Sequence, residues 1–185
     1  MFDYQTHFDS FCRENGLDLR LSFDMPPGYE AANGTFDAET GTVYLNAALL
    51  HDAPDHEQAF YFFHELRHAA QELCPAQCSE AVRRSLRYVI QYDGVCYKRI
   101  GGEYAECRLD GGAERFTDLY LGQPHETDAN AFAYAQARAL YGDSDGLREL
   151  YAFWTPRRPV SDAEYDAVFA EIEENVRLQG RKGNV

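Results

Sequence analysis

The chain has 185 residues, of which 45% are hydrophobic and 14% aromatic, and its formal net charge is −14 at pH 7. This length and apolar content are sufficient to bury the core of one domain. The strong acidic balance argues against a nucleic-acid-binding or membrane-surface protein, because phosphates and anionic headgroups repel it.

The composition also bears on the compartment. No basic start is followed by an apolar run, and no later stretch approaches the roughly 18 apolar residues of a membrane span. The five cysteines are an odd number without the compact spacing of a disulfide framework. Together these features predict a cytoplasmic protein with free thiols. Cys74 and Cys78 are spaced like half of a metal site, but no second pair accompanies them, so free thiols are the favoured interpretation here too.

The N-terminal part of the chain alternates between helix and strand patterns. Residues 2–14 place apolar side chains at helical spacing and predict an amphipathic helix, whereas residues 17–23 alternate as a half-buried strand does. Residues 35–37 and 42–45 predict a hairpin, because the turn-forming segment 38–41 joins them. We therefore expect a small sheet in this region.

The next segment predicts a long helix. Asp55 can cap its start, and Pro75 ends it just after Cys74. Apolar residues recur along it at steps of three and four, which indicates a broad buried face. These residues are Phe60, Phe63, Leu66, Ala70 and Leu73.

The stretch after this helix carries weaker signals. Ser79 is expected to cap a helix that runs to about Gln91. Residues 94–121 are expected to be an insertion. This insertion could cover a cleft, but we favour a surface insertion without such a role. Within it, a two-residue turn at Gly101–Gly102 would pair Cys96 with Cys107 in a hairpin, close enough for a disulfide under oxidation.

The C-terminal part predicts three more helices. Pro124 suits the first position of a long helix that Gly142 ends, and residues 147–154 predict a short one. Residues 161–164 form a capping box for a final helix, with fraying expected from Gly180 onward. The pattern predicts an α+β fold: a mostly helical single domain over residues 1–185, with a small antiparallel or mixed sheet packed beside the helix of residues 55–74.

The long helix contains the pattern H-E-x-x-H at His64, Glu65 and His68. Residues four apart leave the same helix face one turn apart, so both imidazoles can bind one tetrahedral metal ion. Glu65 projects about 100° round the helix, beside the metal, where it can act as a general base. The alternative is that both histidines are ordinary core residues.

A third ligand is expected from the next long helix. Glu126 falls in its first turn, and Asn130 lies one turn later on the same face. Glu126 would complete the site with His64 and His68, and Asn130 would hold a ligand histidine through its other ring nitrogen. The alternative for Glu126 is an acid that only stabilises the helix start.

These patterns, H-E-x-x-H and the later E-x-D-A-N-x-F-A beginning at Glu126, resemble the ImmA/IrrE family of gluzincin-type zinc metallopeptidases. The resemblance covers about residues 30–140. It implies that His64, His68 and Glu126 are zinc ligands, that Glu65 is the general base, and that Asn130 supports the site. The connection between His68 and Glu126 is longer than is usual in that family.

The expected activity is hydrolysis of a peptide bond with one zinc ion per chain. Glu65 would accept the proton of the attacking water and pass it to the leaving amine. The candidate donors for the oxyanion are His125, Tyr134 and Arg67, in that order, because His125 adjoins Glu126 and Tyr134 is two turns along the same helix. For each of them a structural role is the favoured interpretation.

The substrate is expected to be a protein or peptide. An extended peptide could pair with a strand beside the zinc helix, for which we name Val43, Tyr44, Leu45 and Asn46. An ordinary sheet strand is the equal alternative. The family resemblance implies regulatory cleavage or binding of a partner such as a separate transcriptional repressor. No nucleic acid or membrane is expected as a partner, and the oligomeric state stays open.

Two other functions remain open. In the first, the domain is non-catalytic, and zinc stabilises a module for interaction or sensing. In the second, the same metal geometry hydrolyses a small molecule. The presence of Glu65 favours hydrolysis, because a structural metal site does not need a base at that position.

Overall fold

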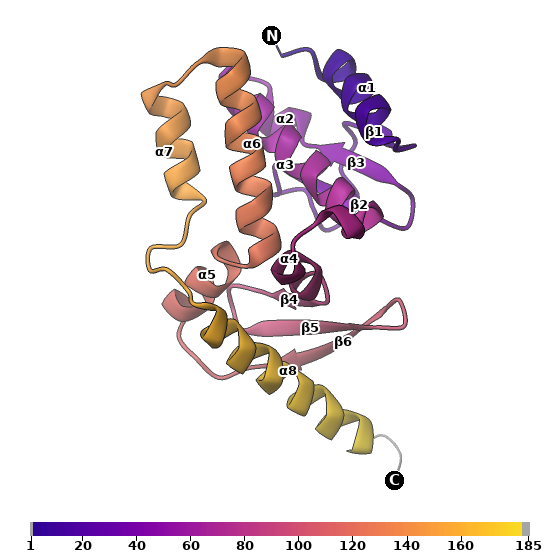
Figure 1. The fold of residues 1–185 in the computed structure, drawn as a ribbon, viewed down its shortest axis with the longest axis vertical. Helices are drawn as coiled ribbons and strands as arrows, with labels where there is room; N and C mark the ends of the chain where they lie inside the picture. The colour runs from indigo at the N-terminus through magenta and orange to yellow at the C-terminus, as the bar shows by residue number, and fades with distance from the viewer. Residues whose placement is uncertain (1, 183–185) are drawn as a thin grey trace. The chain divides into compact units, whose positions relative to one another are not determined.

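The structure is a computed structural model that describes residues 2–182. Helices predominate over these residues, and the strands form two small sheets of three strands each (Figure 1). This confirms the predicted α+β class with mostly helical content. None of the helices in the described part of the chain is long and apolar enough to cross a membrane.

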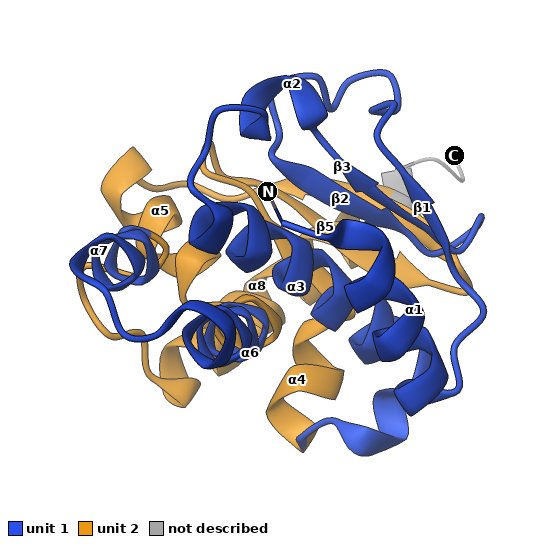
Figure 2. Ribbon diagram, turned by 90° about the horizontal axis from the view of Figure 1, so that it is seen from above, with its two compact units in different colours: residues 1–79, 128–153 blue, residues 80–127, 154–185 orange. Residues whose placement is uncertain are grey.

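The chain divides into two compact units (Figure 2). Unit 1 consists of residues 1–79 and 128–153, and unit 2 consists of residues 80–127 and 154–185. One of the boundaries, between residues 127 and 128, lies inside a continuous helix, α6 (Pro124–Tyr141).

The sheet of unit 1 is mixed. It comprises β1 (Arg20–Ser22), β2 (Gly34–Asp37) and β3 (Thr42–Leu45) in the order β1-β3-β2. The predicted hairpin is confirmed, since β2 and β3 pair antiparallel, with Phe36 opposite Val43. β1 pairs with β3 in parallel. As the middle strand, β3 is the most buried, with both Val43 and Leu45 fully inaccessible.

The long predicted helix is α3 (Asp55–Leu73), which contacts β2 and β3. Its start differs by one residue from the prediction: Pro54 occupies the cap position, and Asp55 is the first helical residue, where its charge favours the helix dipole. Pro75 ends the helix as expected and begins the 3-10 turn η1 (Pro75–Gln77).

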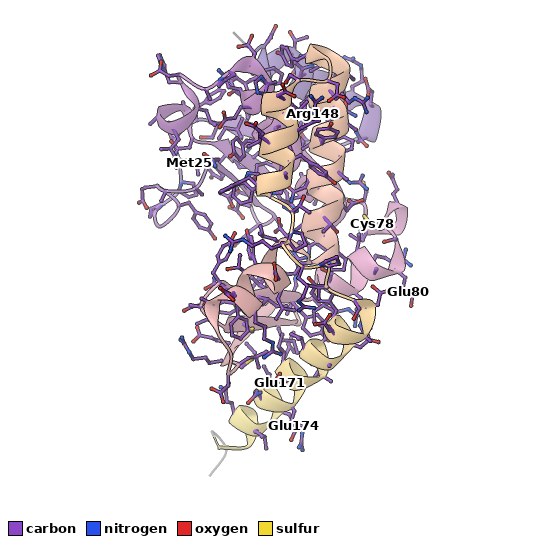
Figure 3. All side chains as sticks on the ribbon, turned by 90° about the vertical axis from the view of Figure 1, so that its left-hand side faces the viewer. Met25, Cys78, Glu80, Arg148, Glu171 and Glu174 are labelled. Carbon is purple, nitrogen blue, oxygen red and sulfur yellow. The ribbon has the colours of Figure 1, made fainter. Side chains whose placement is uncertain are left out.

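Among the described residues, unit 1 contains four α-helices besides α3, including part of α6. The predicted N-terminal helix is α1 (Tyr4–Asn15), and the short α2 (Ala47–Leu50) precedes α3. α6 ends at Tyr141, just before Gly142, whose φ of 81° suits glycine, and α7 (Asp145–Phe153) follows. Arg148, which is labelled in Figure 3, is on α7. Its guanidinium forms ion pairs with Asp143 and Asp145.

The part of unit 2 that follows η1 differs from the prediction. The helix expected over residues 79–91 ends at Ser85, and Tyr88–Ile90 form a strand that pairs with the next one. The aromatic and β-branched side chains of that segment suit a sheet when a partner strand is present. The elements of unit 2 are α4 (Glu80–Ser85), β4 (Tyr88–Ile90), β5 (Val95–Ile100), β6 (Glu103–Arg108), α5 (Ala113–Leu121) and α8 (Asp162–Lys182).

The prediction that residues 94–121 are a surface insertion is wrong, because this segment forms part of a hydrophobic core. Cys96, Leu109 and Phe116 are buried there together with the inner face of α8. The Gly101–Gly102 turn and the pairing of Cys96 with Cys107 are confirmed. The capping box of α8 is also confirmed, but α8 continues through Lys182, and residues 183–185 lie outside the described chain.

Candidate metal centre

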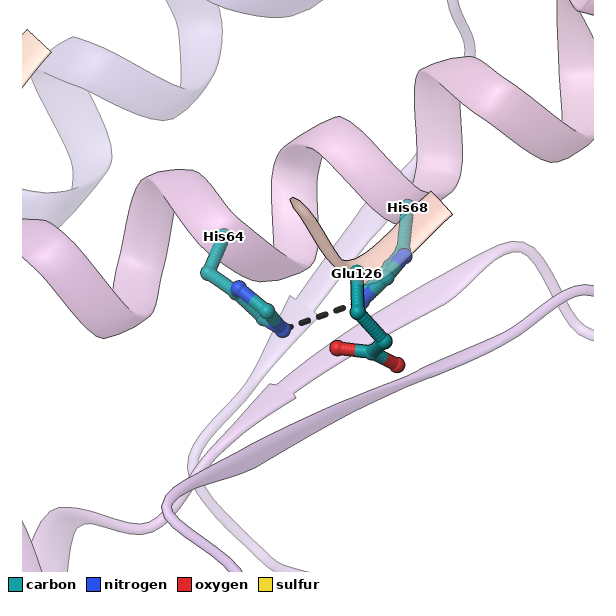
Figure 4. Close-up of side chains that lie close together, drawn as sticks. All are labelled: His64, His68 and Glu126. Atoms are coloured by element: carbon teal, nitrogen blue, oxygen red, sulfur yellow. Dashed lines mark hydrogen bonds between the residues drawn. The ribbon is translucent and has the colours of Figure 1, made fainter. Parts of the chain in front are cut away.

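The two histidines of the H-E-x-x-H pattern lie on one face of α3, one helical turn apart (Figure 4). His64 Nε2 and His68 Nε2 are 3.0 Å apart. Two nitrogens bound tetrahedrally to one zinc ion at about 2.0–2.1 Å would be roughly 3.3 Å apart. The imidazoles are therefore close to the separation that a shared metal ion requires.

Glu126 joins them from the first turn of α6, which begins at Pro124. One ligand atom from each of His64, His68 and Glu126 lies within 4.8 Å of the others. The Glu126 side chain is 13% exposed and points toward the imidazoles in Figure 4. Two imidazole nitrogens and one carboxylate oxygen fit a catalytic zinc ion, which takes three protein ligands and keeps one position open.

Arg67 and Asp128 join α3 to α6 close to these ligands. Arg67 donates to both carboxylate oxygens of Asp128, over 2.7 and 3.1 Å. Burial works to raise the pKa of Asp128, but the hydrogen bonds from Arg67 and Gln71 outweigh it and lower the pKa. The hydrogen bond to Asp128 likewise raises the pKa of Arg67. Because Asp128 is two residues after Glu126 on α6, this pair holds the helix turn that carries the candidate ligand Glu126.

Glu65 follows His64 and is packed against the sheet. Its side chain is largely buried, with 7% of the residue exposed. A Cβ atom placed on Gly34 of β2 would lie 2.6 Å from Glu65 Cγ. The absence of a side chain at Gly34 therefore provides the space in which the predicted base lies.

Gln71 is a residue that the sequence analysis missed. Its Oε1 lies 2.9 Å from His68 Nδ1, and its Nε2 donates to Asp128 Oδ2 over 2.8 Å. At His68, Gln71 takes the role expected of Asn130. The expectation that Asn130 holds a ligand histidine stays a prediction, and Asn130 is buried on α6 at 3% exposed. The spacing of three residues between His68 and Gln71 was the available signal, because such residues are neighbours on a helix.

His125 and its neighbour Glu126 both belong to unit 2, and their side chains lie close to each other. His125 Nε2 lies 3.5 Å from Glu126 Oε1, and the other ring nitrogen bonds to the Ser85 hydroxyl. Ser85 is 0% exposed, so this serine, histidine and carboxylate series cannot offer a nucleophile to a substrate. The arrangement suits a histidine that positions Glu126, and the predicted oxyanion role of His125 stays untested.

Tyr134 lies away from the ligands. It is eight residues after Glu126, which places it about 12 Å farther along the helix axis. Its hydroxyl donates to Asp143 over 3.2 Å, and its ring packs on Tyr151 with centroids 4.7 Å apart. The hydroxyl of Tyr134 is thus bound near the end of α6, and its role as an oxyanion donor stays a prediction.

The predicted substrate strand is corrected. Val43, Tyr44 and Leu45 are on β3, which pairs with β1 on one side and β2 on the other, and Asn46 follows as the cap of α2. A strand with two partners cannot accept a peptide as a third. The strand at the sheet edge that contacts α3 is β2, which contains Gly34.

No protein-family model, curated protein or solved structure matches this chain. The resemblance to the ImmA/IrrE family thus stays a prediction from the two short patterns. The function is accordingly argued from the geometry of His64, Glu65, His68 and Glu126.

Proposed function

We propose that this chain is a zinc-dependent hydrolase that cleaves peptide bonds, with His64, His68 and Glu126 as the metal ligands and Glu65 as the general base. The observation that carries the proposal is the convergence of three ligand atoms within 4.8 Å from two helices, with an acidic residue next to the first ligand. A zinc ion bound there would supply a Lewis acid for the carbonyl and lower the pKa of water to about 7.

Glu65 would accept a proton from the attacking water and return it to the leaving amine. Its position between the ligand-bearing face of α3 and Gly34 keeps the carboxylate largely out of bulk solvent.

A peptide is the substrate class that the sheet favours. β2 is an edge strand of the unit 1 sheet, and an extended peptide can add to such an edge through backbone hydrogen bonds. Gly34 of β2 contacts Glu65, so a peptide on this edge would pass close to the proposed base. Regulatory cleavage of a partner protein and a cytoplasmic location remain predictions from the sequence.

The second candidate is a non-catalytic domain in which a metal holds α3 and α6 together. One observation weighs against it. The Arg67, Gln71 and Asp128 side chains join these helices by hydrogen bonds. A metal would thus add to a connection that these side chains make, and a structural site does not need a base at the position of the buried Glu65.

The test combines metal analysis with a peptidase assay. Purified wild type, Glu126→Ala and Glu65→Gln would be analysed by mass spectrometry for metal, then incubated with a diverse peptide library. We expect about one zinc ion per wild-type chain, retention of zinc in Glu65→Gln and its loss in Glu126→Ala.

Hydrolysis is expected in the wild type alone. Absence of metal after expression in zinc-replete medium would overturn the metal site, and hydrolysis unchanged by Glu65→Gln would overturn the assignment of the base. Zinc binding with no hydrolysis of any peptide would favour the interaction domain.

A further inference from the structure

The two ring nitrogens of His68 face different partners. Nε2 lies 3.0 Å from His64 Nε2 on the metal side, and Nδ1 lies 2.9 Å from Gln71 Oε1 on the opposite side. A neutral imidazole carries one proton, so only one of its nitrogens is available as a metal ligand. The hydrogen-bond partner at Nδ1 therefore decides which nitrogen can bind.

The direction of the bond at Nδ1 follows from Asp128. A carboxylate oxygen accepts hydrogen bonds, so the atom of Gln71 that faces Asp128 must be the amide nitrogen. The other end of the amide, Oε1, then faces His68 and can only accept. Nδ1 must carry the proton, which leaves the lone pair of neutral His68 on Nε2.

The positions of Gln71 and Asp128, the two residues on the Nδ1 side of His68, are themselves fixed by their surroundings. Asp128 receives two hydrogen bonds from the Arg67 guanidinium, which fixes the plane of the carboxylate. Gln71 is 0% exposed, so bulk water does not compete for its amide. A reversal of this amide would set its nitrogen against Nδ1–H and its oxygen against the carboxylate, two unfavourable contacts in a buried place.

We propose that Gln71 is a positioning residue which, held by Asp128 and Arg67, keeps His68 in the Nδ1–H tautomer and presents Nε2 to the metal. Its consequence for metal binding rests on the proposed function, whereas the tautomer is a property of the metal-free chain. In that state the 3.0 Å contact makes His64 Nε2–H the donor and His68 Nε2 the acceptor.

The tautomer can be read directly from the full-length protein. Long-range proton–nitrogen NMR correlation spectra of the metal-free wild type, at about pH 8 where histidines are ordinarily neutral, identify the protonated ring nitrogen. We expect Nδ1–H for His68 in the wild type and a population of the Nε2–H form in Gln71→Leu and Asp128→Asn. An Nε2–H wild type, or an unchanged spectrum in both variants, would overturn the proposal.

Gln58→Leu is the matched control. Gln58 is also a buried glutamine of α3, at 6% exposed, and bonds to Tyr4 and to the Ala53 carbonyl. It precedes His68 by ten residues, about 15 Å along the helix. Its substitution should lower the unfolding temperature without changing the His68 tautomer. A tautomer change equal to that in Gln71→Leu would show that loss of packing alone is responsible, and would overturn the proposal.

Zinc titration supplies the second measurement. Loss of the hydrogen-bonded partner of a ligand histidine weakens metal binding by about 10–100-fold. We expect this loss in Gln71→Leu and wild-type affinity in Gln58→Leu. Equal affinity in wild type and Gln71→Leu would overturn the positioning role. If the wild type binds no zinc but shows the Nδ1–H tautomer, the proposed function fails while the assignment of the tautomer stands.

Discussion

Glu65 lies against the backbone of Gly34, so closely that a Cβ atom at residue 34 would be 2.6 Å from Glu65 Cγ and 3.1 Å from its Cδ. The same added atom would be 3.0 Å from the Tyr44 carbonyl oxygen, which belongs to the neighbouring strand and cannot move easily. The position of the proposed base thus depends on the absence of one side chain on the edge strand.

Gly34→Ala is expected to displace Glu65. Overpacking of this kind costs about 1–3 kcal/mol of unfolding free energy. A misplacement of the base by about 1 Å can lower kcat by about 100-fold. Zinc content should stay at the wild-type level, because the ligands are on other residues. Urea unfolding, turnover of a peptide substrate and metal analysis would measure the three effects.

Gly112→Ala is the control for this substitution, since a Cβ atom there meets nothing within 4 Å. It should leave stability and kcat close to those of the wild type. Wild-type kcat in Gly34→Ala would contradict the proposed place of Glu65.

Arg67→Met is expected to destabilise unit 1. The substitution removes two charge-assisted hydrogen bonds to Asp128, whose side chain is 30% exposed. We expect a loss of about 1–3 kcal/mol in urea unfolding. Arg148→Met removes ion pairs in which Arg148 is 49% and Asp145 88% exposed, and should cost less than about 1 kcal/mol. Equal losses in the two variants would show that the Arg67 pair contributes no more than a surface pair.

His125→Gln separates two roles for this histidine. If His125 positions Glu126, the substitution should weaken zinc binding by about 10-fold, because outer partners of metal ligands have effects of this size. Ser85→Ala, which acts only through His125, should shift the affinity in the same direction. If His125 instead donates to the oxyanion, kcat would fall in His125→Gln with unchanged zinc affinity. Zinc titration and steady-state kinetics would distinguish these outcomes.

Stability is expected to fall at alkaline pH. Burial, with Cys107 nearby, raises the pKa of the Cys96 thiol from its ordinary value of 9.0 to about 12. Burial, followed by the hydrogen bond to Glu173, raises the pKa of Tyr88 from 10.0 to about 12. Each group loses its proton more readily when the chain is unfolded. Their contribution is thus complete below about pH 9 and declines as the pH rises toward 12.

The measurement is the urea midpoint between pH 7 and pH 11. It should be level to about pH 9 and then fall, with a smaller fall in Cys96→Val, which has no thiol to ionise. A slope unchanged by this substitution would contradict the role of Cys96. The same raised pKa predicts that iodoacetamide at about pH 8 alkylates half-buried Cys74 before Cys96 in the native protein, which peptide mass spectrometry would show.

Much of the fold could be predicted from local patterns. The boundaries of α6, the hairpin of β2 and β3, and the register of Cys96 opposite Cys107 follow from turn residues and periodicity. The segment after Ser79 could not be predicted, because Tyr88–Ile90 form a strand only where β5 offers a partner. The burial of residues 94–121 in a core could likewise not be predicted, because the residues that they pack against are on α8, far along the chain.

The sequence by itself was sufficient to predict the proposed ligand set. The spacing of His64 and His68 is a helical turn, and Pro124 places Glu126 at a helix start, so both signals act over a few residues. Only the tertiary structure decided which group holds His68 from behind, which strand is the edge of the sheet, and where Tyr134 binds. Those relationships depend on contacts between segments far apart in sequence, and local periodicity carries no information about such contacts.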